Sequence, residues 1–187
     1  MKDTHSLDLF GFYQLAKAPT LSVVKPAPVA TVPSNWAEVH PVIDYSMRAL
    51  CAKAYPGHPK GCPNLNDPNH PQCPPHVPRI EVAFALTRPV WAVWNVFPFG
   101  EHVARMREKH PAWSRRQLEC CLYWQGTGRK DLKRILGEFL RNHRGLVAYS
   151  PEALGVNVTE TMRSIGIELE WPPVTVAYQI VFAGSRA

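Results

Sequence analysis

A segment rich in cysteine, proline and glycine, residues 51–78, constrains this chain more than any other. Three cysteines, Cys51, Cys62 and Cys73, stand in it at equal spacing, with ten residues between each and the next. Proline recurs so often between them that neither a continuous helix nor a central strand is expected. The few apolar side chains in the segment cannot offset roughly 1–2 kcal/mol of backbone entropy per ordered residue. Bonds from thiolates to a metal would supply the missing stabilisation, so the segment predicts a metal site.

The spacing of the cysteines bears on which metal is held. Structural zinc sites usually include two ligands only two to four residues apart, and the three cysteines contain no such pair. Widely spaced cysteines can surround a larger group such as a [4Fe–4S] cluster, and proline follows Cys62 and Cys73 as it follows a ligating cysteine in ferredoxin-type sequences. An iron–sulfur cluster is therefore the first expectation and zinc the alternative. A third interpretation is a surface loop whose cysteines are incidental or joined by a disulfide.

A [4Fe–4S] cluster has four irons, so a fourth ligand is needed. The remaining cysteines are Cys120 and Cys121, which point about 100° apart if both lie on one helix. We expect Cys121 to complete the set and Cys120 to belong to the core. If neither reaches the other three, one iron is open to substrate as a Lewis acid and the chain is an enzyme, so enzymatic activity stays undecided. His58 and His70 are alternative ligands within the segment.

The rest of the chain has the pattern of an α+β domain. We expect a small, mainly antiparallel or mixed sheet with about four helices, and the proline-rich cysteine loop packed on it. A single metal-binding domain covers 1–187, in which 19–41 form a proline-rich extended arm and 51–78 form the cysteine loop. Strands are predicted at 80–86, 90–97, 145–149 and 174–182, and helices at 101–110, 114–124, 129–143 and 157–165, with a brief helical segment at 43–50.

Several local signals support these assignments. The first two strands are expected to form a hairpin, and the last strand is expected to be buried on both faces. Ser114 and Gln117 have the spacing of a capping box. Gly126-Thr-Gly128 should break the chain before helix 129–143. That helix carries one apolar face, made of Leu132, Ile135, Leu136, Phe139 and Leu140.

The positive charge of the chain is concentrated in one region. The formal net charge is +6, and residues 105–144 contain eleven Lys and Arg against four Asp and Glu, a local balance of +7. Such a surface suits nucleic acid or an acidic partner, although basic residues on a helix are often only its solvated face. Arg129 and Lys130, after the expected glycine turn, are candidate anion-binding residues.

No segment of the sequence is predicted to enter a membrane. No stretch reaches the 18 to 20 apolar residues of a membrane span, and the first fifteen residues do not have the pattern of a secretory signal. We therefore expect a cytoplasmic protein, in which a cysteine cluster is more often a metal or catalytic site than a disulfide framework.

Two motifs of the sequence are Gly61-Cys-Pro-Asn64 with Cys73-Pro-Pro75, and the segment Pro151 to Thr161. They resemble those of a group of small predicted metal-binding proteins from prokaryotes and their viruses, whose biochemical role is undefined. The resemblance implies an iron–sulfur-like site and supplies no reaction. The first functional hypothesis is thus a [4Fe–4S] protein with redox or cluster-dependent chemistry on a small or nucleic-acid-derived substrate, or with a redox partner. The alternative is a zinc-stabilised module that uses the 105–144 surface to bind nucleic acid or an acidic partner.

Overall fold

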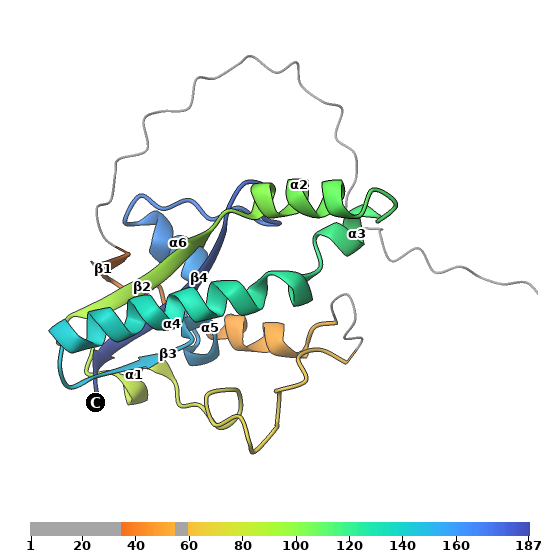
Figure 1. Ribbon diagram of the computed structural model, residues 1–187. Coiled ribbons are helices and arrows are strands. Elements are labelled where there is room, and N and C mark those ends of the chain that lie inside the picture. The colour runs from red at the N-terminus through yellow and green to blue at the C-terminus, as the bar shows by residue number, and fades with distance from the viewer. Residues whose placement is uncertain (1–34, 55–59) are drawn as a thin grey trace, which may run out of the picture. The chain divides into compact units, whose positions relative to one another are not determined.

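The computed structural model describes residues 35–54 and 60–187 and shows an α+β fold, as predicted. Its sheet has four strands in the order β1-β2-β4-β3, and each neighbouring pair is antiparallel (Figure 1). The predicted helix 43–50 is the 3-10 helix η1, and most of the predicted arm at 19–41 lies outside the described residues. The strands are β1 (Trp36–Val39), β2 (Val90–Phe97), β3 (Leu146–Tyr149) and β4 (Ala177–Ser185).

The helices differ widely in length. The long ones are α2 (Phe99–Lys109) and α4 (Gln125–Asn142). None of the described helices is both long and apolar enough to span a bilayer. The short helices are η1 (Tyr45–Ala52), α1 (Ile80–Ala83), α3 (Arg115–Leu118), η2 (Cys121–Tyr123), α5 (Pro151–Leu154) and α6 (Val158–Arg163).

Helix α4 covers one face of the sheet, and the sequence pattern predicted this. Ile135 and Phe139 are buried against Val93 of β2 and Ala183 of β4. Leu136 and Leu140 pack at the margin of this cluster. The spacing of these side chains places them along one side of the helix, so the charged residues between them face away from the sheet.

The short helices α1, α5 and α6 pack on the other face. Trp94 of β2 and Phe182 of β4 lie in the same cluster as Leu154 and Met162. Neighbouring residues in a strand point to opposite faces, which is why Phe182 and Ala183 belong to different clusters. Strand β2 is therefore covered on both sides. Strand β4 is buried from Phe182 to Gly184, but its residues 178–181 are half-buried, so the prediction of a last strand buried on both faces holds only in part.

The predicted strand at 80–86 is wrong, and so is the hairpin that contained it. Residues 80–83 form helix α1, in which Ile80 and Ala83 are buried while Val82 is 65% exposed. Burial at positions i and i+3 is the helical period, whereas a strand would have placed Ile80 and Val82 on the same face. Packing on the core therefore overrides the strand preference of these β-branched residues.

The region from Ser114 to Gly128 also differs from expectation. The capping box of Ser114 and Gln117 is present, but α3 ends at Leu118 instead of continuing to Trp124. Helix α4 begins at Gln125, so Gly126 and Gly128 lie inside it and do not break the chain. Gly128 has a packing role, because a Cβ there would lie 2.7 Å from Oε1 of Gln179.

The remaining predicted elements are confirmed with small shifts of their ends. Helix α2, strand β3 and helix α6 occur where expected. Asn157 caps α6 by accepting a hydrogen bond from the backbone N–H of Glu160. Gly166, with φ of +79°, lies just beyond that helix, where the left-handed conformation favours glycine.

Candidate functional site

The cysteine loop is tied to the end of η1 by its backbone. Cys51 lies in η1, and its carbonyl oxygen accepts a hydrogen bond of 2.8 Å from the N–H of Cys62. Gly61 makes this approach possible, because it has φ of +86° and a Cβ there would lie 2.5 Å from the Cys51 carbonyl oxygen. The sequence therefore brings Cys62 back to Cys51 through a glycine that no other residue replaces without strain.

A series of turns brings Cys73 back to the same region. The N–H of Asn66 donates to the carbonyl of Pro74 at 3.0 Å, which closes the loop between Cys62 and Cys73. The loop is then anchored by Val77, which is buried in the core and whose N–H donates to the Cys73 carbonyl. Backbone hydrogen bonds, more than apolar contacts, thus shape the segment.

Two thiols of this loop, those of Cys51 and Cys73, have a raised pKa. Burial raises the pKa of the Cys51 thiol, and Cys62, Cys73 and Glu152 raise it further, whereas Arg48 lowers it. Burial and the nearby Cys62 likewise raise the pKa of the Cys73 thiol. A thiol with a raised pKa stays protonated at neutral pH, so the protein alone does not hold the thiolate form that ligates metals.

The thiols do not form a finished coordination shell. Within residues 35–54 and 60–187, no group of three or more His, Cys, Asp or Glu side chains could hold a metal ion. All five cysteines are free, so the loop is not crosslinked by a disulfide. Three of these thiols lie in one region of the structure, but they are not arranged to bind one metal ion together. They are the thiols of Cys51, Cys62 and Cys73.

The other two cysteines lie outside the cysteine loop. Cys120 and Cys121 lie between α3 and the start of α4, and Cys121 is exposed. His58 falls outside the described residues. His70 is exposed, and its Nδ1 is 2.9 Å from Oδ2 of Asp67, within the loop.

The glycine turn predicted before Arg129 and Lys130 is absent, because Gly126 and Gly128 lie inside α4. Arg129 and Lys130 are exposed, and a guanidinium N–H of Arg129 donates to Oε1 of Gln125 at 3.1 Å. Their candidate anion-binding role stays a prediction, now without the turn that motivated it.

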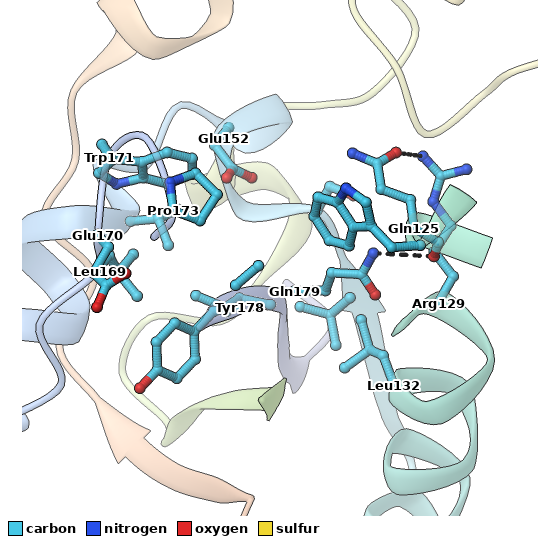
Figure 2. A pocket seen from close by; sticks show the side chains of 16 residues that line it. Gln125, Arg129, Leu132, Glu152, Leu169, Glu170, Trp171, Pro173, Tyr178 and Gln179 are labelled. Carbon is cyan, nitrogen blue, oxygen red and sulfur yellow. Dashed lines mark hydrogen bonds between the residues drawn. The ribbon is translucent and has the colours of Figure 1, made fainter. Parts of the chain in front are cut away.

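A cavity of about 580 Å³, lined by residues of α4, α5 and β4 among others, was not predicted. Figure 2 shows Glu152 and Trp171 on its walls, with Gln179 and Arg129 from β4 and α4. Glu152 connects the cavity to the thiols, since its charge acts on Cys51. Glu152 is exposed as a residue. The atoms around its carboxyl group nevertheless desolvate that group, which raises its pKa.

A buried amide network holds the cavity wall. Asn95 of β2 is 1% exposed, and its side-chain N–H donates to the Gly128 carbonyl at 2.8 Å. Its Oδ1 accepts from the backbone N–H of Gln179 at 3.0 Å, and the Gln179 side chain donates to the Gln125 carbonyl at 3.3 Å. The signal in the sequence was an amide in the middle of an apolar strand, because a buried polar side chain needs partners.

Comparison of the chain with models of protein families, with curated proteins and with solved structures finds no match.

Proposed function

We propose that this chain is a metal-binding protein whose Cys51, Cys62 and Cys73 thiolates ligate an iron–sulfur cluster, with a [4Fe–4S] cluster as the first expectation. The observation that carries the proposal is the return of three evenly spaced cysteines to one region through the Cys62 to Cys51 hydrogen bond and the turns that follow. Thiolate sulfur is the ligand that iron–sulfur clusters and zinc share.

The electrostatics of the loop suit a cation. Because neighbouring thiols raise the pKa of Cys51 and of Cys73, formation of several thiolates together is unfavourable without a compensating positive charge. A bound metal deprotonates its thiol ligands, and the free energy of binding then contributes to folding. The proposal requires the loop to adjust on binding, since the thiols do not form a shell by themselves.

The identity of the fourth ligand decides between electron transfer and catalysis. Cys121 remains the predicted ligand, whereas Glu152 is the acidic residue whose charge acts on Cys51. A cluster iron without a protein ligand would act as a Lewis acid toward a bound substrate. In that case the chain is an enzyme. With four cysteine ligands, the cluster would instead transfer electrons to or from a redox partner.

Metal analysis of anaerobically purified protein tests the proposal. We expect about four iron and four sulfide per chain, the composition of a [4Fe–4S] cluster, and loss of most of both in Cys51→Ser, Cys62→Ser and Cys73→Ser. Cys120→Ser is the matched control and should keep its metal, while Cys121→Ser reports on the fourth ligand. Zinc without sulfide would support the zinc alternative, and a metal-free chain with normal stability in all three variants would refute both.

A second candidate is the zinc-stabilised module that binds nucleic acid or an acidic partner through the 105–144 surface. The observation that favours it is the outer face of α4, where Lys130, Lys133 and Arg141 are exposed and make none of the ion pairs found within the described chain. Three other cations of the region are paired: Arg105 with Glu101, Arg115 with Glu119 at 2.7 Å, and Arg134 with Asp131 and Glu138. The number of unpaired cations is therefore smaller than the eleven counted in the sequence.

Binding to a DNA duplex at several salt concentrations tests this candidate. Lys130→Gln, Lys133→Gln and Arg141→Gln together should weaken binding and flatten its salt dependence, by a slope of about 0.9 for each phosphate that these cations no longer neutralise. Arg115→Gln removes a charge of the same region that is already paired, so it should change the slope less. Equal effects of both sets, or no salt-sensitive binding, would exclude the duplex-binding role.

A further inference from the structure

Strand β4 has a partner along nearly its whole length on one side only. It pairs with β2 from Ala177 to Gly184, whereas β3 pairs with Phe182 to Ser185 alone. Within the described part of the chain, residues 177–181 therefore form an open edge on the side of β3. Such an edge presents backbone donors and acceptors to whatever lies beside it.

The register shows which backbone groups face the gap. The N–H of Gln179 donates to Oδ1 of Asn95 in β2, so the backbone of Gln179 faces β2. Successive residues in an antiparallel strand turn their N–H and C=O groups to opposite sides. Tyr178 and Ile180 therefore direct theirs away from β2, as does Phe182, which lies opposite Tyr149 of β3.

A proline sets the end of β3. Continuing the register two residues beyond the Tyr149 and Phe182 pair would place Pro151 opposite Ile180. Proline has no N–H to donate at that position, and its fixed φ suits the first turn of a helix. Pro151 is the first residue of α5, which leads the chain away from the sheet. Pro151 therefore explains why β3 does not continue along residues 177–181 of β4.

The cavity of about 580 Å³ lies along this open edge. Residues 177–181 form one wall, and Ser150 and Glu152 from the chain that leaves β3 line it as well (Figure 2). The volume falls within the range of about 300–1,000 Å³ that is usual for ligand sites. Two donor and acceptor pairs, at Tyr178 and Ile180, stand two residues apart, or about 6.8 Å along an extended strand.

The carboxyl groups around the cavity favour a positively charged occupant. The carboxylate of Glu170 is held by the N–H groups of Val174 and Thr175, at 2.8 and 2.7 Å, which lowers its pKa and keeps it ionised. Glu152 contributes a second carboxyl group, whose pKa is raised by desolvation and which a nearby cation would favour in its ionised form. The cation in the lining is Arg129, which already donates to Gln125.

We propose that the open edge of β4 at Tyr178 and Ile180 binds an extended peptide segment of a partner protein that carries a lysine or arginine side chain. The segment adds to the sheet in the place that β3 leaves, with its backbone paired to these two residues and its basic side chain directed to Glu152 and Glu170. Strand addition of this kind derives affinity from backbone hydrogen bonds and specificity from side-chain contacts. The backbone N–H and C=O groups of Tyr178 and Ile180 repeat at the spacing of a second extended strand. This spacing is longer than a ligand made of a single small ring.

Amide hydrogen exchange on the full chain, followed by NMR, tests the proposal with a defined probe. The probe is the acetylated and amidated peptide Thr-Val-Lys-Val-Thr. In the free protein the amides of Tyr178 and Ile180 should exchange quickly, and saturating peptide should slow both at least about tenfold. The same peptide methylated at its pairing nitrogens should bind at least about tenfold more weakly, because it lacks the donors.

Two comparisons test the charge preference and independence from the metal site. Replacing lysine by glutamate in the peptide should weaken binding, and Glu152→Gln should reduce that difference. Cys62→Ser should bind the peptide as the native chain does, so failure of the metal proposal leaves this one standing. Equal affinity of the methylated and unmethylated peptides would overturn the proposal. So would slow exchange at Tyr178 and Ile180 in the free chain, since the edge would then be covered by the chain itself.

Discussion

Replacement of Asn95 by leucine should destabilise the fold more than any exposed substitution, because this side chain joins three elements. It lies in β2, donates to Gly128 in α4 and accepts from Gln179 in β4. Leucine fills a similar space but offers neither a donor nor an acceptor. The substitution therefore measures the contribution of the two hydrogen bonds to stability, because the volume packed against the strand stays similar.

The magnitude follows from the two bonds. Loss of the acceptor leaves the buried N–H of Gln179 without that partner, which costs about 1–3 kcal/mol. Loss of the bond to the Gly128 carbonyl adds about 1 kcal/mol, since that oxygen lies in a helix and can keep its helical partner. We therefore expect the free energy of unfolding to fall by about 2–4 kcal/mol. For a chain of this size the corresponding fall in Tm is roughly 5–15 °C.

Urea unfolding followed by far-ultraviolet circular dichroism measures this change, with Asn142→Leu as the control. Asn142 is exposed and only donates to the Glu138 carbonyl at 3.3 Å, so its replacement should alter stability by less than about 0.5 kcal/mol. If Asn95→Leu is also within about 0.5 kcal/mol of the native chain, the amide network does not hold the sheet to α4.

Three further changes probe the cysteine loop and the cavity. Gly61→Ala should lower metal content without unfolding the core, because its Cβ would meet the Cys51 carbonyl, and retention of full metal would contradict this role of the glycine. Gly155→Ala should cost about 1 kcal/mol or more, since the residue has φ of +90° and its Cβ would meet the Tyr45 ring; an unchanged Tm would count against that contact. Glu152→Gln should be increasingly more stable than the native chain as pH rises from about 4 to 7, because a carboxyl whose pKa is raised on folding is penalised when it ionises. Unfolding curves at each pH measure the difference, and a constant difference would show that Glu152 is not desolvated.

The sequence predicted the elements whose pattern is local. The apolar spacing of 132–140 sufficed for α4, and the capping residues Ser114 and Asn157 marked helix starts that the structure confirms. The α+β class followed from the alternation of such helices with β-branched strands.

The errors arose where tertiary contacts outweigh local preference. Ile80 and Val82 have strong strand preference, yet only one of them finds the core. Gly128 looked like a helix breaker, but its missing side chain lets α4 approach Gln179. In both cases the deciding partner lies far away in the sequence.

In the candidate site, the cysteines could be found from the sequence pattern, whereas the cavity could not. Equal spacing singled out Cys51, Cys62 and Cys73, and the structure returns them to one region. The cavity could not be found from local patterns, because it depends on the register of β3 against β4 and on the position of Pro151 in that register. The pairing of β3 with β4 is needed to see that β3 ends before Pro151 and leaves part of the β4 edge unpaired.

X-ray absorption at the metal edge of the loaded protein tests the shared thiol site most directly, because it counts the sulfur atoms bound to the metal. If Cys51, Cys62 and Cys73 act together, the iron should show a first shell of sulfur at about 2.3 Å with a short iron–iron distance, and zinc should show at least three sulfur ligands at that distance. Cys62→Ser should lose sulfur from the shell, whereas Cys120→Ser should not. A shell made of nitrogen and oxygen alone, unchanged in Cys62→Ser, would contradict a thiol site in this loop.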